Sequence, residues 1–120
     1  MTPLKVKQKL FEVRAVVHDL HLNSTSFAEH KALGELYESW GGLLDSFLET
    51  YYGKYERIKG TIDIQSSTDI NVNSYLSKVK MFLDNDINTI VDENNDSDLC
   101  NIIAEMKQIV NHTTYLLTLK

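Results

Sequence analysis

Apolar residues recur near the start of the chain at alternating steps of four and three positions, which is the spacing of one face of an α-helix. Thr2 precedes Pro3, and this pair suits the beginning of a helix. The threonine caps the first turn, and the proline lacks an N–H that the turn would leave unbonded. The pattern predicts an amphipathic helix over residues 3–22, with a buried face formed by Val6, Leu10, Val13, Val17 and Leu20.

Three later segments show the same helical period. Ser26, followed by Glu29 three positions later, has the sequence of a capping box and marks the start of the second helix. Asp96 or Ser97 is the expected cap of the last helix. These three helices are expected over residues 27–57, 73–91 and 97–118.

The connections between the predicted helices differ in length. The first two helices are joined by about four residues and the last two by a similarly short turn, so each pair should form an antiparallel hairpin. Residues 59–72 show no helix period and form a linker of about 14 residues, which can reach about 45 Å, enough to run back along a bundle. A plain up-down-up-down bundle would need only a short turn there. We therefore expect an all-α four-helix bundle, a single domain over residues 1–120, with a long crossover between helices two and three.

Charge and composition narrow the classes of partner. The net charge of −5 argues against general affinity for duplex DNA, so DNA binding is not expected, and the basic cluster of Lys5, Lys7 and Lys9 is interpreted as a solvated helix face. No apolar run approaches the roughly 20 residues of a membrane span, and the N-terminus lacks a signal-peptide core. The lone Cys100 suits a reducing compartment. The expected location is the cytoplasm, without membrane association.

Four polar residues lie beside the predicted apolar faces. His21 follows Val17 by four positions and so stacks over a core position, while His30, Asp45 and Glu49 share one side of the second helix. His21 and His30 flank the first turn and should lie near each other. Asp45 and Glu49 are one helical turn apart, close enough to chelate one cation. Imidazole and carboxylate groups together suit iron or zinc, so these four residues are candidate metal ligands.

The spacing of these ligands sets a geometric condition. His30 and Asp45 are fifteen positions apart on one helix, which is about 22 Å along its axis, so they cannot bind the same ion within one chain. An antiparallel two-fold pairing of second helices would bring the histidines of one subunit to the carboxylates of another, and would form two such sites. A metal site therefore requires at least a homodimer.

Structural roles could also account for these residues. His21 could be a hydrogen-bonded histidine at a helix C-terminus, favoured there by the helix dipole, and His30 could be a first-turn surface residue. Asp45 and Glu49 could be a solvated pair, although like charges at this spacing are mildly destabilising without a cation or a partner. Structural or core roles are also expected for His18, His112, Tyr37 and Trp40.

The residues around these candidates resemble the ferroxidase signature of the Dps mini-ferritins. That family has a His-Trp-Asn tripeptide, a second histidine, and an Asp-x-x-x-Glu pair fifteen and nineteen positions after the second histidine. The resemblance covers about residues 17–55, and the whole chain is also similar to small phage-encoded Dps-like proteins. The matching residues here are His21-Leu22-Asn23, Phe27-Ala28-Glu29-His30 and Asp45-x-x-x-Glu49.

The resemblance implies a ferritin-like fold and an intersubunit site that binds iron, or another divalent ion such as zinc in its place. It further implies oxidation and storage of Fe(II) and a dodecameric cage, and, for a phage-encoded protein, a location in the bacterial host cytoplasm. Three departures are clear. Leu22 replaces the family tryptophan, and the two histidines are nine rather than about twelve positions apart. Gly34 stands where the family has a carboxylate four positions after the second histidine.

Two functions from different classes therefore remain open. The first is a Dps-type iron-binding protein, with His21, His30, Asp45 and Glu49 as ligands and ferroxidase activity as its chemistry. The second is a ferritin-like interaction or virion-associated structural protein without metal chemistry, for which Gly34 in a ligand position is the main argument.

Overall fold

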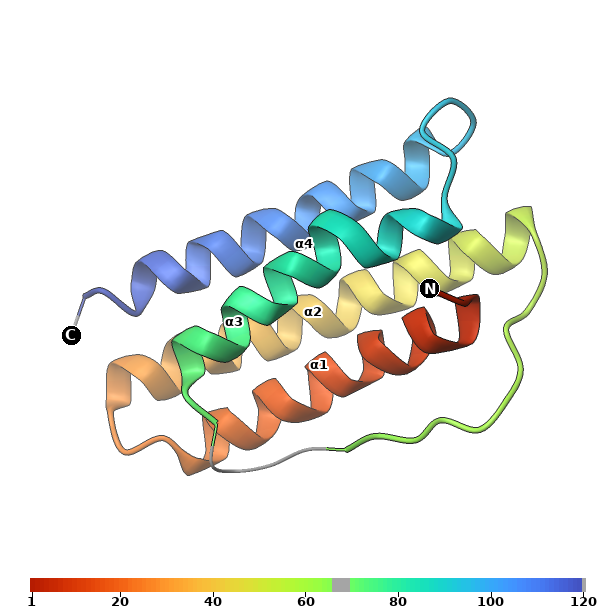
Figure 1. The fold of residues 1–120 in the computed structure, drawn as a ribbon. Coiled ribbons are helices and arrows are strands. Elements are labelled where there is room, and N and C mark those ends of the chain that lie inside the picture. Colours follow the sequence, from red (N-terminus) through yellow and green to blue (C-terminus); the bar gives the residue numbers. More distant parts are fainter. Residues whose placement is uncertain (66–69, 120) are drawn as a thin grey trace.

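A computed structural model describes residues 1–65 and 70–119, and these residues form a bundle of helices with no strand among them (Figure 1). The four-helix bundle expected from the sequence is confirmed at this level. The helices are α1 (Pro3–Asn23), α2 (Phe27–Lys54), α3 (Val72–Met81) and α4 (Ser97–Leu116), and α3 continues into a π-helical turn, η1 (Phe82–Asp86), and a 3-10 turn, η2 (Ile87–Ile90).

Helix α2 is central to the packing, because it contacts both α1 and α4 along its length. In Figure 1, α1 and α2 form an antiparallel hairpin, α4 runs antiparallel to α2, and α3 runs in the same direction as α2. Residues 55–65, which follow α2, run back along the bundle beside α1, and α3 then starts at the same end of the bundle as α2 (Figure 1). None of the described helices is both long enough and apolar enough to cross a membrane.

The first part of the crossover is fastened to α1. The Lys7 ammonium group donates to the carbonyl of Ile58 at 2.7 Å, and the Gln8 side chain donates to the carbonyl of Thr61 at 3.2 Å. Gly60 has φ +147°, and a Cβ there would lie 2.7 Å from the Leu4 side chain. Only glycine meets both conditions at this point of close approach. These contacts hold the returning chain against the outer side of the first hairpin.

The interior of the bundle is apolar. Trp40 is fully buried, and its indole N–H donates to the carbonyl of Leu10 at 2.9 Å, so its one polar atom is satisfied. Among the described residues the buried polar side chains are Asp96 and Thr113, and the Thr113 hydroxyl donates to the carbonyl of Ile109 within α4. Within the described residues, the bundle core therefore lacks the set of inward-facing glutamates and histidines that holds a di-iron centre inside one bundle.

Several helix boundaries differ from the sequence expectation. Helix α2 ends at Lys54 rather than at residue 57, because the backbone leaves the helix at Tyr55, whose hydroxyl bonds to Asp96. The segment expected as the third helix is helical as far as Ile90, but only Val72–Met81 is α-helical, and a π-helical and a 3-10 turn complete it. In the segment that follows, Asn88 donates to the carbonyls of Leu83 and Asp84, so a side chain competes for acceptors of the regular helix.

Asp96 was expected as a helix cap, but its side chain makes no capping bond to α4. The buried carboxylate instead forms an ion pair with Lys54 at 2.8 Å and accepts hydrogen bonds from the Tyr55 hydroxyl at 2.6 Å and the Asp92 N–H at 2.8 Å. These bonds, that from Lys54 first, lower the pKa of Asp96 from its usual 3.8 to about 2. The carboxylate thus ties the C-terminus of α2 to the loop before α4.

The lowered pKa of Asp96 makes a prediction for acid stability. Because the folded protein favours the ionised carboxylate, Asp96 contributes its full stability above about pH 4 and loses it as the pH falls to about 2. We expect the free energy of unfolding of the wild type to fall more steeply between pH 4 and pH 2 than that of Asp96→Asn, measured by urea denaturation. Glu93→Gln, which alters an exposed carboxyl in the same loop, should keep the wild-type slope. Parallel curves for the wild type and Asp96→Asn would contradict the prediction.

Candidate metal centre

The two histidines that flank the first turn lie against each other, as the sequence predicts. His21 is in the last turn of α1 and His30 is in the first turn of α2. Their ring centroids are 3.8 Å apart and their planes are inclined by only 18°, so the imidazoles are stacked. Both side chains are half-buried.

Each histidine is hydrogen-bonded to the backbone of the other. His21 Nδ1 lies 2.5 Å from the carbonyl oxygen of His30, and His30 Nδ1 lies 2.8 Å from the carbonyl oxygen of His21. A carbonyl oxygen only accepts, so Nδ1 carries the proton in both rings. In the neutral rings Nε2 therefore keeps its lone pair. A metal-binding histidine commonly donates its other ring N–H to a backbone carbonyl, which fixes its tautomer and orientation in this way.

The His21 ring lies where a side chain at position 34 would begin. A Cβ at residue 34 would lie 2.8 Å from His21 Cε1 and 3.0 Å from Nδ1, closer than a side chain tolerates. The imidazole therefore occupies the space into which a side chain at position 34 would project. In the Dps resemblance, Gly34 stands in the place of a ligand. In the structure, the lack of a side chain at this position leaves room for the His21 ring.

Further rings continue the row of side chains between α1 and α2. His18 stacks on Tyr37 with centroids 4.2 Å apart, and the His18 and His21 centroids are 6.5 Å apart. The Arg14 guanidinium lies 5.0 Å from the centre of the Tyr37 ring, within the range of a cation–π contact. The stack on Tyr37 fits the structural role expected for His18. Nothing in the spacing of the sequence indicated this row.

The two carboxylates lie elsewhere on α2, as their spacing requires. Asp45 and Glu49 are exposed, and within the described residues neither forms an ion pair. Across residues 1–65 and 70–119, no three His, Cys, Asp or Glu side chains come close enough together to hold one metal ion. One chain thus brings together the two imidazoles but not the imidazoles and the acidic pair.

The stacked geometry also determines how the imidazoles could bind metal. A metal ion lies in the plane of the ring that binds it, at about 2 Å from the nitrogen. Two planes inclined by 18°, with centroids 3.8 Å apart, do not meet within that distance. As they lie in this structure, His21 and His30 can each hold an ion of their own but cannot share one ion.

Two glycine substitutions in α2 test the packing of His21. An alanine at Gly42 would meet no atom within 4 Å, so Gly42→Ala should raise the free energy of unfolding by about 0.5–1 kcal/mol through helix propensity. Gly34→Ala should lose this gain, because the new methyl group displaces the His21 ring and breaks a hydrogen bond worth about 1 kcal/mol. Urea denaturation gives the stabilities, and ¹⁵N NMR of the imidazoles reports the loss of the His21 Nδ1–H bond. Equal stabilisation by both substitutions, with an unchanged His21 signal, would show that Gly34 is not needed for this packing.

Comparisons with known proteins identify a family without assigning an activity. Neither the curated proteins nor the solved structures that were searched gave a match. A protein-family model matches residues 21–117, which include both histidines, both carboxylates, the crossover and all of α4. Since this match spans most of the chain, the protein belongs to the family of unknown function DUF5856.

Proposed function

We propose that the protein is a ferritin-like, Dps-type iron-binding protein whose metal site lies between two subunits. His21 and His30 of one subunit provide imidazoles, and Asp45 and Glu49 of another provide carboxylates. The observation that carries this proposal is the pair of reciprocal Nδ1–H bonds, which leaves both Nε2 atoms free for metal. The apolar bundle core adds support, because it leaves the surface as the place for a metal site in the described chain.

Exposed apolar side chains beside the histidines support a site covered by a second subunit. Phe27 is 78% exposed and Leu22 is 64% exposed, the two highest values among the large apolar side chains of the described residues. Both lie at the turn between α1 and α2, next to His21 and His30. A neighbouring subunit that supplies the carboxylates would also remove this apolar surface from water.

The positions of the ligands along α2 suit an antiparallel pairing of two copies. The midpoint between Asp45 and Glu49 is as far beyond the level of Glu38 and Ser39 as His30 is before it. A two-fold axis at that level therefore exchanges the histidine and the acidic pair. Gly42 lies close to this level, is exposed, and has open space where a Cβ would be. This part of α2 therefore allows a second helix to approach closely.

The ligand set suits the binding and oxidation of ferrous iron as a substrate. Carboxylates and imidazoles together bind ferrous ion, and the stacked rings offer two adjacent positions, one on each histidine. Two ferrous ions supply the two electrons that reduce one hydrogen peroxide molecule to two hydroxide ions. By the resemblance to Dps proteins, the ferric product would be stored inside a dodecameric cage.

A subunit-mixing experiment tests the proposal. His21→Ala/His30→Ala and Asp45→Ala/Glu49→Ala should each abolish high-affinity binding of Fe(II), measured anaerobically as metal per chain, and should abolish ferric absorbance above buffer background under air. When the two variants are mixed and reassembled, a mixed dimer contains one site with both halves intact and one with neither. Random mixing should therefore restore about one quarter of the wild-type binding. His112→Ala and Glu93→Ala, which alter exposed residues away from these ligands, should bind iron as the wild type does.

The mixing experiment separates the proposal from its alternatives. Iron binding that survives in either double variant would exclude these ligands. Loss in both variants without recovery on mixing would exclude a site built from two subunits. A folded wild-type protein that binds no iron would leave the histidine pair with a structural role at the turn between α1 and α2. That result would favour the interaction or virion-associated function.

A further inference from the structure

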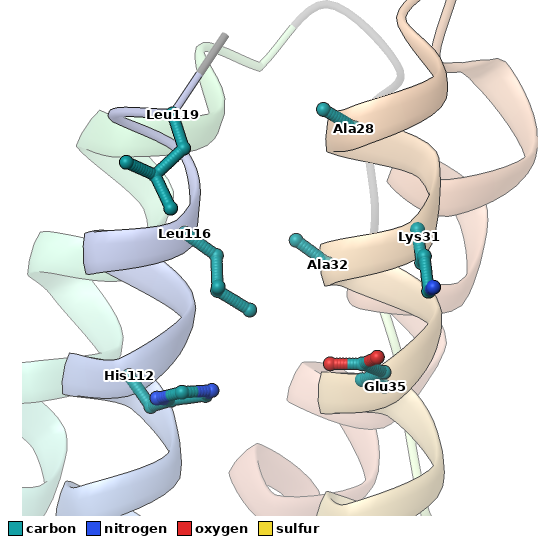
Figure 2. A pocket seen from close by; sticks show the side chains of 7 residues that line it. All are labelled: Ala28, Lys31, Ala32, Glu35, His112, Leu116 and Leu119. Atoms are coloured by element: carbon teal, nitrogen blue, oxygen red, sulfur yellow. The ribbon is translucent and has the colours of Figure 1, made fainter.

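A groove runs between α2 and α4 on the side of α2 that faces away from α1 (Figure 2). At one end it forms a hollow of about 300 Å³, lined by Ala28 and Ala32 of α2 together with Leu116 and Leu119 from the C-terminal part of the chain. At the other end a hollow of about 510 Å³ is lined by residues that include Ser39, Leu43, Glu105 and Ile109. His112 borders both hollows.

The groove is open because small side chains on one wall oppose leucines on the other. Figure 2 shows Leu116 and Leu119 across open space from Ala28 and Ala32, with His112 and Glu35 facing each other farther along. Leu119 remains 56% exposed. The walls thus present apolar surface to water along the contact of two long helices, and the histidine site at the α1 side of α2 makes no use of it.

The two ends of the groove differ in charge, because the smaller hollow has the cation Lys31 beside Glu35, whereas the larger hollow has the anion Glu105 and no lysine or arginine. Lys31 borders the smaller hollow, and Glu105 borders the larger one at the level of Leu43. Lys31 and Leu43 are twelve positions apart on α2, so the lysine and the glutamate are separated by about 18 Å along the groove. The midpoint falls between Glu35 and Ser39, at the centre of the groove.

We propose that a second copy of this chain occupies the groove through a two-fold axis at its midpoint. Such an axis reverses the direction of the groove and brings Lys31 of each copy opposite Glu105 of the other, which forms two equivalent ion pairs. It also sets the leucine-bearing end of each copy against the larger hollow of the other. The cation Lys31 and the anion Glu105 lie equally far from the centre of the groove and so form a self-complementary pair of charges, with Glu35 close to the axis. A partner of uniform charge would leave either Lys31 or Glu105 opposed by like charge.

This contact goes beyond the proposed metal site and uses a different edge of α2. Residues of the groove, such as Ala32 and Ser39, lie on the side of α2 next to α4, whereas His30 and Gly34 lie on the side next to α1. The two contacts can therefore be tested separately. If both form, each chain contacts two different neighbours, and the assembly must be larger than a dimer.

A charge exchange at the groove provides the test. Lys31→Glu and Glu105→Lys, each alone, place like charges opposite each other at both ends of the contact. Each should weaken association by about tenfold or more, measured as a dissociation constant by sedimentation velocity at low salt. Lys31→Glu combined with Glu105→Lys should restore the constant to within about threefold of the wild-type value. The matched controls Lys78→Glu on α3 and Glu93→Lys in the loop before α4 alter exposed charges outside the groove and should change it little.

A steric variant tests the position of the axis independently of charge. Ser39 is exposed at the centre of the groove, so Ser39→Trp should leave the fold intact by circular dichroism while it blocks the second copy. We expect a reduced mass in solution. Gln108→Trp, on the α4 wall of the larger hollow and away from the histidines and the acidic pair, should reduce the mass likewise and leave Fe(II) binding per chain unchanged. A wild-type protein that stays monomeric at high concentration, or an assembly that neither Ser39→Trp nor the charge reversals alter, would overturn the proposal and leave the groove to another protein's helix. Failure of the metal site would appear as lost iron binding with these groove effects intact.

Discussion

Helix α2 packs against α1 along one edge and against α4 along another, and this double contact organises the molecule. Its buried face supplies Trp40 and Phe47 to an apolar core, which leaves no place there for a cluster of ligands in the described chain. The remaining surface of α2 consists of these two edges and the exposed strip between them. The histidine stack lies at the α1 edge, the groove at the α4 edge, and Asp45 and Glu49 on the exposed strip.

In the histidine stack, the hydrogen bonds that pack α1 against α2 also leave both Nε2 atoms available for a metal ion. The reciprocal bonds join the end of α1 to the start of α2, and His30 also satisfies the His21 carbonyl, one that a helix end leaves without its usual partner. The same bonds hold the protons on Nδ1 and orient both rings. Gly34 allows this arrangement because the His21 ring lies where a side chain would begin. A carboxylate side chain at position 34 would therefore displace the His21 ring from this stack.

Two charged groups in this structure have roles set by their surroundings rather than by their place in a motif. Asp96 occupies a typical capping position, yet its carboxylate is buried against Lys54 and Tyr55 and anchors a helix end from the neighbouring loop. Lys31 lies next to His30 in the chain but borders the groove between α2 and α4. In both cases neighbouring elements decide what the charge does.

The helical period alone determined the number of helices, the face that each buries, and the separation of His30 from Asp45, because these depend only on the repeat and rise of an α-helix. The short first turn likewise determined that His21 and His30 would meet. The tertiary structure decided the rest: the end of α2 at Lys54, the burial of Asp96, the ring that fills the space at Gly34, and the open groove beside α4. Each of these depends on atoms brought together from elements distant in the chain, and a local periodic pattern carries no information about which side chains will meet there.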